Sequence, residues 1–216
     1  MTPRVAVLAS GGGSNLQAIL DHFDARGATR CAEVVLVASD RASAGALDRA
    51  RSGGIAAVAL DADQRGDGMS ALLESYRVDL IALAGYLRFI PVEVTRRWRG
   101  RIVNVHPSLL PSFGGAGMYG IRVHQAVIAA GVRVTGVTVH FVDEEYDRGP
   151  IIAQWPVPVL PHDDAETLAR RVLAVEHRIY PAALDALASG TVTLGDDARV
   201  IGWSPDFSFV CSPQPV

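Results

Sequence analysis

The sequence predicts an α/β fold built on an open, mostly parallel sheet. Short apolar, β-branched runs alternate along the chain with segments of helical periodicity, a pattern typical of strands linked by crossover helices. Most of these runs are continuously apolar, as expected for strands that helices cover on both faces. Together the two observations predict a Rossmann-like sheet of about seven strands with helices on both faces.

Seven apolar runs are expected to form the strands, because each is short and bounded by polar residues or glycine. They are residues 4–9, 33–39, 55–60, 79–84, 101–105, 134–142 and 151–157. The last two are joined tightly enough to be antiparallel, so the direction of run 134–142 relative to the others is left open. The loop after it, residues 143–149, is expected at the carboxyl edge of the sheet only if this run is parallel to the rest.

Five shorter segments and one long segment carry helical periodicity. The shorter ones are residues 15–24, 44–52, 69–76, 91–98 and 121–130. The long one begins after Asp163 and Asp164, which suit an N-cap, and Gly190 is a natural stop. We expect Pro181 to kink or split this long helix, because proline cannot donate a helical hydrogen bond.

The chain length, 216 residues, fits one domain. We expect this domain to cover residues 1–202. The tail, residues 203–216, holds three prolines and three serines, and we expect it to be mobile. The same expectation applies to the glycine-rich segment 112–120.

Charge and cysteine content exclude several classes of protein. A net charge of −3 without a basic stripe argues against a nucleic-acid partner. All 20 basic residues are arginines, which excludes Schiff-base catalysis by lysine and a Walker lysine. Cys31 and Cys211 are too few for a disulfide framework or a metal knuckle, and we expect no metal.

The apolar runs are too short for targeting or membrane segments. The run near the N-terminus ends at glycines, and the longest run, residues 80–90, contains Arg88. Neither has the length of a signal peptide or a membrane span. We therefore expect no membrane partner and a cytoplasmic protein.

The first motif is a glycine turn, Gly11 to Gln17, between the first strand and the first helix. Glycines let a backbone approach a ligand, and a helix N-terminus attracts phosphate. Ser14 and Gln17 have the spacing of a capping box, and Asp40 ends the second strand, where a ribose-binding acid would stand. The dinucleotide fingerprint fails because Leu16 replaces its last glycine. A phosphate site is favoured over a merely tight turn.

The second motif is Asn104-Val105-His106-Pro107-Ser108-Leu109-Leu110-Pro111. Asn104 and His106 lie two apart on an extended segment, so they project to the same side. An amide donor beside a group that titrates near neutral pH suits acyl transfer. Taken alone, a histidine at a strand end is more often structural.

The third motif is the strand end and acidic loop from His140 to Pro150. A loop of this kind is usually solvated, and His140 inside a strand is best interpreted by itself as a buried core histidine.

Together these motifs resemble one family, the glycinamide ribonucleotide formyltransferases. The glycine turn, segment 84–88, the Asn-Val-His-Pro-Ser-Leu-Leu-Pro run, strand 139–143 and the Glu176-His177 pair follow the family's order and spacing. The resemblance covers about residues 4–195 and implies transfer of a formyl group from 10-formyltetrahydrofolate to glycinamide ribonucleotide. It implies these two small-molecule substrates and a monomer or homodimer.

The resemblance also implies roles for individual residues. His106 is similar to the family's general acid, Asn104 to its oxyanion ligand, and Asp147 to the aspartate that keeps the histidine charged and oriented. The nucleotide's phosphate is implied at Gly13, Ser14 and Asn15, and its ribose at Glu176. The folate is implied at Arg65, Leu87, Arg88, Phe89, Ile90, Asn104 and Asp143.

The chain departs from the family pattern twice. Segment 112–120 is several residues longer than usual, and Leu173 stands where relatives often place a polar nucleotide contact. Three alternatives are less favoured. A methionyl-tRNA formyltransferase is expected to carry a further RNA-binding domain, and a formyltetrahydrofolate hydrolase a regulatory domain. A non-catalytic nucleotide-binding module leaves Asn104, His106 and Asp147 unexplained.

Overall fold

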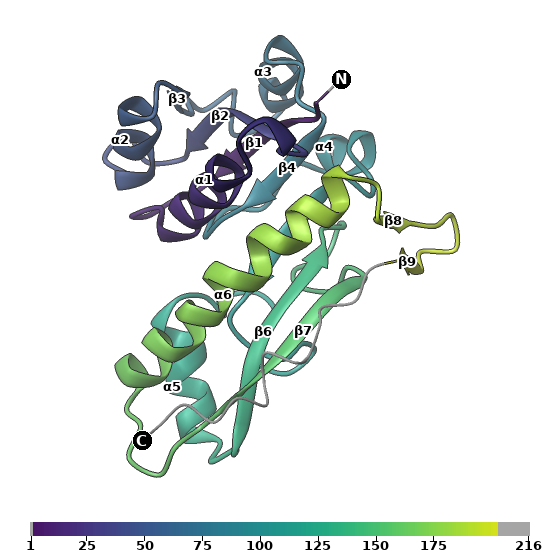
Figure 1. Cartoon of the computed structure of the whole chain (residues 1–216). Helices are drawn as coiled ribbons and strands as arrows, with labels where there is room; N and C mark the ends of the chain where they lie inside the picture. The colour runs from purple at the N-terminus through teal and green to yellow at the C-terminus, as the bar shows by residue number, and fades with distance from the viewer. Residues whose placement is uncertain (1, 203–216) are drawn as a thin grey trace.

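A seven-stranded sheet forms the centre of the molecule (Figure 1), described here for residues 2–202 of a computed structural model. The strand order is β3-β2-β1-β4-β5-β6-β7. Strands β1 to β5 are parallel, β6 is antiparallel to β5, and β7 is antiparallel to β6. The predicted fold class is confirmed. The strands are β1 Arg4–Leu8, β2 Glu33–Ser39, β3 Ala56–Ala59, β4 Leu80–Leu83, β5 Ile102–His106, β6 Val134–Phe141 and β7 Ile151–Pro158.

Helices cover both faces of this sheet, because alternate strand residues point to opposite sides. On one face Val5 and Val7 belong to a core that includes α1, α2, α5 and α6. On the other face Ala6 and Leu8 belong to a second core that includes α3 and α4. The helices are α1 Ser14–Arg26, α2 Gly45–Ser52, α3 Gly68–Ser75, α4 Val92–Arg97, α5 Ile121–Ala129 and α6 Ala165–Ala188, with a short 3₁₀ turn Gly27–Thr29 after α1.

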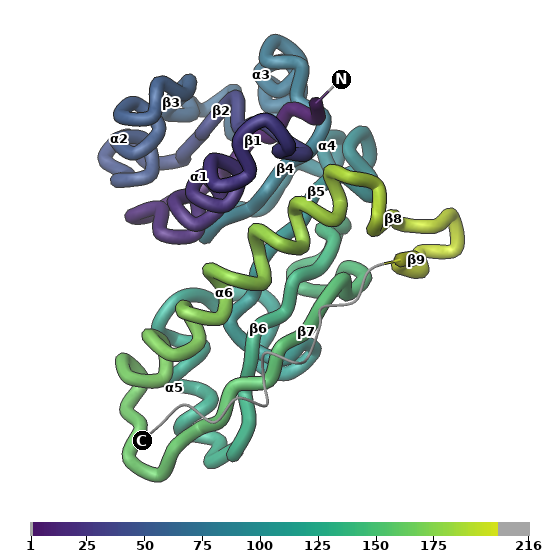
Figure 2. Tube along the Cα trace, viewed as in Figure 1, coloured from purple at the N-terminus to yellow at the C-terminus, as the bar shows by residue number. Residues whose placement is uncertain are grey.

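The longest helix, α6, packs against α1 and α5 and crosses strands β5 to β7 (Figure 2). Its N-cap is Asp164, whose side chain accepts a hydrogen bond from the backbone N–H of Thr167. Pro181 lies inside one continuous 24-residue helix, so the expectation that it splits the helix is wrong. Buried side chains on both sides of the proline, among them Ile179 and Leu184, belong to the same core, and this packing outweighs the lost hydrogen bond.

Two further strands were not predicted. Strands β8 Val192–Leu194 and β9 Val200–Gly202 pair as a separate antiparallel hairpin after α6. Strands of three residues are too short to show a period. The predicted tail, residues 203–216, lies outside the described residues, and the boundary at 202 stays a prediction. Among residues 2–202, no helix combines the length and the apolar character needed to cross a membrane.

Candidate active site

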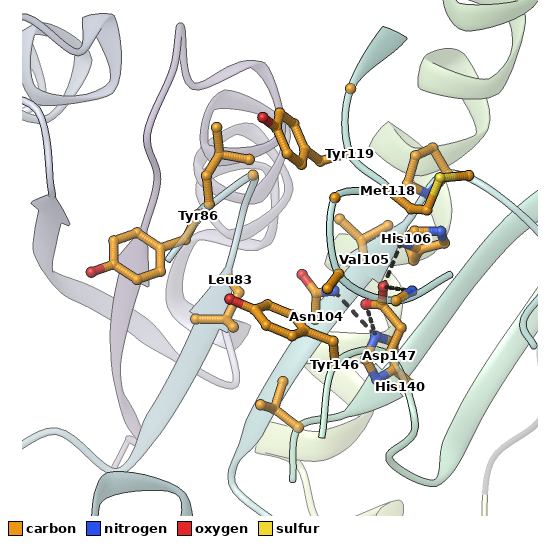
Figure 3. A pocket seen from close by; sticks show the side chains of 18 of the residues that line it. Leu83, Tyr86, Asn104, Val105, His106, Met118, Tyr119, His140, Tyr146 and Asp147 are labelled. Atoms are coloured by element: carbon orange, nitrogen blue, oxygen red, sulfur yellow. Dashed lines mark hydrogen bonds and ion pairs between the residues drawn. The ribbon is translucent and has the colours of Figure 1, made fainter. Parts of the chain in front are cut away.

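A cavity of about 420 Å³ lies at the carboxyl ends of β4 and β5 (Figure 3). Its walls come from the loops after β4, β5 and β6 and from the facing side of α6. This is the place where open parallel sheets bind ligands. Ten residues implicated by the sequence line it: Asn15, Leu87, Arg88, Phe89, Ile90, Asn104, His106, Asp143, Asp147 and Glu176.

His106, the last residue of β5, is buried in one wall of this cavity. Its Nε2 lies 2.8 Å from the carbonyl oxygen of Phe113, and because a carbonyl only accepts, Nε2 donates. Its Nδ1 lies 3.5 Å from Oδ2 of Asp147. Burial lowers the pKa of His106, and although Asp147 and the Phe113 carbonyl raise it, burial prevails. The lowered pKa is contrary to the expectation that Asp147 keeps this histidine charged.

Asp147 connects three groups of the site. Its Oδ2 accepts a hydrogen bond of 2.8 Å from the backbone N–H of Gly115, and its Oδ1 lies 3.6 Å from Nε2 of His140. Burial raises the pKa of Asp147, but His140, His106 and the Gly115 N–H together outweigh burial and leave this pKa lowered. The carboxylate is ionised at neutral pH.

Asn104 and His140 face each other across the β5–β6 pair. The Nδ1 of His140 lies 2.8 Å from the carbonyl oxygen of Phe141 and donates to it. In the neutral ring Nε2 is then the acceptor, and it lies 3.1 Å from Nδ2 of Asn104. This contact orients the Asn104 amide, and no group among residues 2–202 accepts from its second N–H. His140 is buried as expected, but it also joins Asn104 to Asp147.

The acidic loop reaches the site although β6 is antiparallel to β5, so the condition set from the sequence was wrong. Phe141, the last residue of β6, pairs with Val103 near the start of β5. The loop closes on itself, because the N–H of Phe141 donates to the Pro150 carbonyl and β7 begins beside His140. The loop therefore folds back over the sheet and carries Asp147 to His106.

The glycine-rich segment 112–120 also contacts the site, through Phe113 and Gly115. Phe113 has a φ of 55° and Asp147 a φ of 54°, so both residues that approach His106 have left-handed backbones, which is rare for a bulky aromatic residue. A Cβ on Gly114 would come within 3.2 Å of Asp147 Cβ. This segment thus places its backbone against His106 and Asp147, the two groups at the centre of the site.

Asn15 and Glu176 line one side of the cavity. Asn15 Nδ2 donates to Glu176 Oε2 over 2.6 Å, and burial raises the pKa of Glu176 despite this bond. Asn15 Oδ1 is buried without a hydrogen-bond partner among the described residues. Leu173, one turn earlier on α6, also lines the cavity. A polar ligand would satisfy the unpaired amide oxygen.

The glycine turn next to Asn15 differs from the expected capping box. The N-cap of α1 is Gly13, with a φ of 76°, and no side chain caps the helix. The side chain of Gln17 instead donates to Asp21. The capping-box prediction is therefore wrong, because the helix begins at Ser14 and a left-handed glycine makes the turn.

Asp40 does not stand free for a ribose. Its carboxylate accepts from the Ser10 hydroxyl and lies 3.1 Å from Nε of Arg88. Arg88 still lines the cavity, together with Leu87, Phe89, Ile90 and Asp143. Burial raises the pKa of the neighbouring Tyr86 to about 12, so this wall holds a neutral phenol.

Of the predicted site residues, Gly13 and Ser14 lie outside the cavity lining, and so does Arg65. Its guanidinium donates to the carbonyl of Leu60 over 2.8 Å. Other lining residues were missed by the sequence reasoning. His124 of α5 is buried with an unpaired Nδ1 among the described residues, and Tyr146 packs edge-on against Phe89 with ring centroids 5.1 Å apart. His124 belongs to none of the three motifs, and Tyr146 lies in the third motif without a role having been assigned to it.

Comparison with known proteins identifies the family. Residues 3–184 match the family described as formyl transferase. The chain belongs to the formyl transferase family. Among residues 2–202 of this formyltransferase, no group of three or more His, Cys, Asp or Glu residues is arranged to hold a metal ion.

Three relatives locate the formyltransferase within its family. It is 44% identical to the trifunctional purine biosynthetic protein adenosine-3 of Gallus gallus over 91% of this chain, but spans only 20% of that protein. It is 42% identical to the chloroplastic phosphoribosylglycinamide formyltransferase of Arabidopsis thaliana, over 90% of this chain and 68% of the relative. The crystal structure of phosphoribosylglycinamide formyltransferase from Anaplasma phagocytophilum matches with a TM-score of 0.82 and 38% identity, over 95% and 97% of the two chains. The predicted resemblance is confirmed.

Proposed function

We propose that this chain transfers the formyl group of 10-formyltetrahydrofolate to the amine of glycinamide ribonucleotide, yielding formylglycinamide ribonucleotide in de novo purine biosynthesis. The observation that carries the proposal is the group formed by His106, Asp147 and Asn104 in one wall of the cavity. Acyl transfer needs a group that moves a proton and a donor for the developing oxyanion. This group supplies both.

Proton transfer is assigned to His106. The ring is neutral in the ligand-free protein because burial lowers its pKa. Its Nε2–H is held by the Phe113 carbonyl, which leaves Nδ1, beside Asp147, to exchange a proton. When the amine nitrogen bonds to the formyl carbon, Nδ1 takes the amine proton. Asp147 stabilises the resulting imidazolium, which then protonates N10 of the folate as the bond from the formyl carbon to N10 breaks.

The oxyanion is assigned to Asn104. As the amine attacks, the formyl oxygen gains negative charge in the tetrahedral intermediate. One N–H of the Asn104 amide is held by Nε2 of His140, and the other is available to donate to that oxygen. A donor fixed before the reaction stabilises the charge without reorganising.

The folate is assigned to the cavity, and the nucleotide to the cavity wall at Asn15 and Glu176 together with the adjoining glycine turn. The phosphate is placed at Gly13, Ser14 and Asn15, where α1 begins, because a helix N-terminus attracts anions. Glu176, bonded to Asn15, is placed at the ribose. The folate is placed along Leu87, Arg88, Phe89, Ile90 and Asp143, an apolar slot with a few polar groups.

One assay tests the function. The purified protein is mixed with 10-formyltetrahydrofolate, with and without glycinamide ribonucleotide, and formation of tetrahydrofolate is followed. We expect deformylation that requires the nucleotide and produces formylglycinamide ribonucleotide. Equal deformylation without the nucleotide would indicate hydrolysis, and no deformylation in either case would exclude the proposed reaction. A cytoplasmic location and a monomeric or homodimeric state stay predictions.

A further inference from the structure

The underside of the glycine turn is held by α2 and by the first turn of α1. The carbonyl of Gly11 accepts from the backbone N–H of Ala46 over 3.1 Å. The carbonyl of Gly12 accepts from Nε of Arg49 over 2.8 Å. The carbonyl of Gly13 accepts from the N–H of Gln17 over 2.9 Å. Three successive carbonyls of the turn are therefore bonded inside the protein.

These bonds set the direction of the neighbouring N–H groups. In a planar trans peptide the carbonyl and the following N–H point to opposite sides. The N–H groups of Gly12 and Gly13 are therefore turned away from α2, and that of Ser14 is turned away from the Gln17 N–H of α1. Within residues 2–202 none of the three has a hydrogen-bond acceptor. Successive N–H groups that converge in this way bind anions.

Arg49 also carries a charge that no carboxylate neutralises. Among residues 2–202 no Asp or Glu oxygen lies within 4.0 Å of its guanidinium, whereas Arg51 on the same helix pairs with Asp48 at 2.7 Å. A second bond of 3.0 Å, from Nη1 of Arg49 to the side chain of Gln17, ties the guanidinium to α1. The positive charge is thus fixed behind the turn.

We propose that Arg49 is a positioning residue for the phosphate of the nucleotide substrate. It holds the Gly12 carbonyl so that the Gly13 N–H faces the ligand, and its unpaired charge favours an anion there without touching it. The inference rests on the proposed function, since it concerns the phosphate site assigned to that reaction.

The test compares Arg49→Met with Arg51→Met. Each variant removes one guanidinium from α2 and keeps an apolar stem, but only Arg49 contacts the glycine turn. We expect Arg49→Met to raise KM for glycinamide ribonucleotide by about 10-fold, as for loss of one charge-assisted hydrogen bond. KM for the folate and kcat should change less than about 2-fold. Arg51→Met should match the wild type.

Two further measurements exclude a merely structural role. Arg49→Lys keeps the charge and one donor, so it should recover most of the nucleotide KM. Binding of inorganic phosphate by calorimetry should weaken in Arg49→Met and not in Arg51→Met, whether or not the wild type catalyses formyl transfer. Equal phosphate affinity in the two variants, or a nucleotide KM that Arg49→Met leaves unchanged, would overturn the inference. So would parallel changes in both KM values with a lower melting temperature.

Discussion

At the scale of single residues, two opposing effects decide the state of His106. Burial disfavours the imidazolium, whereas the carboxylate of Asp147 at 3.5 Å favours it. Burial has the larger effect and lowers the pKa of His106, so the ring is neutral at neutral pH and can accept a proton from an attacking amine. Asp147 then acts chiefly on the charged form that appears during the reaction.

Replacement of Asp147 by asparagine tests this division of roles. Asp147→Asn keeps the shape of the side chain but removes the charge that raises the pKa of His106. The pKa of the ring should therefore fall further below its usual value of about 6.5, and turnover near neutral pH should fall about 10-fold or more, with both KM values largely kept. The checks are NMR titration of the ring and the pH–rate profile. An unchanged ring pKa with full activity would remove Asp147 from the mechanism.

Removal of the His106 imidazole should lower turnover more than Asp147→Asn does. We expect His106→Ala to lower kcat by roughly 10²–10⁴, the usual contribution of positioned acid–base catalysis. His22→Ala is the matched control, because His22 lies on α1 and does not line the cavity. Thermal unfolding of each variant must accompany the assay. A folded His106→Ala that retains most of the wild-type kcat would show that His106 is structural.

The sequence points to Asn104 and His106 because an amide donor beside a titratable ring has its own chemical meaning, whereas Asp147 is implied only by the family resemblance. It did not predict that His140 would join them. The role of His140 depends on the β5–β6 register, which sets it opposite Asn104, and register between strands over 30 residues apart in sequence cannot be read from local pattern. The charge state of His106 could not be predicted from the sequence either, because the burial that lowers its pKa depends on tertiary packing.

At the scale of elements, the local patterns predict the seven strands of the central sheet and the six α-helices found in residues 2–202. Parallel strands and amphipathic helices carry continuous or periodic apolar residues, so their positions follow from the sequence. The direction of β6 and the course of the loop after it cannot be predicted in this way, because both depend on which strands pair with each other. The hairpin β8–β9 is too short to leave a pattern.

The turn into α1 offers a test at this scale. A Cβ on Gly13 would lie 2.8 Å from Cα of Ala46, and the φ of Gly13 is left-handed. We expect Gly13→Ala to lower the free energy of unfolding by about 2–4 kcal/mol, from backbone strain and overpacking against α2. It should also raise KM for the nucleotide far more than KM for the folate.

Gly54→Ala is the control for this experiment. Gly54 also has a positive φ, but a Cβ there would meet no atom within 4 Å. Urea denaturation of Gly54→Ala should therefore show the strain alone, about 1–2 kcal/mol. Similar losses in the two variants would mean that α2 yields to the added methyl group, and equal effects on both KM values would mean that the turn only shapes the fold.

At the scale of the whole molecule, the site exists because distant segments meet at one sheet edge. The loops after β4 and β5 arrive there by parallel topology, the loop after β6 by folding back, and α6 by its length. The meeting buries several titratable groups together. Burial lowers the pKa of His106 and of His124, which lie in the same cavity wall. The free energy of unfolding should therefore depend on pH, and the pKa shifts of these groups determine whether it rises or falls.

For a histidine with a lowered folded pKa, the unfolded chain binds the proton more readily. Its contribution to stability is full above the unfolded pKa of about 6.5 and is lost as pH falls toward the folded pKa. We expect the free energy of unfolding of the ligand-free protein to decrease as pH is lowered from 7 to 5, with each histidine adding at most about 1.4 kcal/mol per pH unit to the slope. Glu176 opposes this trend, because its raised pKa favours the folded state only as pH falls.

Urea denaturation across this pH range, in wild type, His106→Gln and His124→Gln, measures the effect. Each variant should have a shallower slope than the wild type, because the neutral amide does not titrate. His162→Gln, which removes an exposed histidine outside the cavity, controls for loss of a histidine as such. If His106→Gln and His162→Gln give the same slope, His106 is not held neutral by burial. The folded and unfolded chains would then bind the proton of His106 equally, and burial would not be the reason that Nδ1 starts the reaction unprotonated.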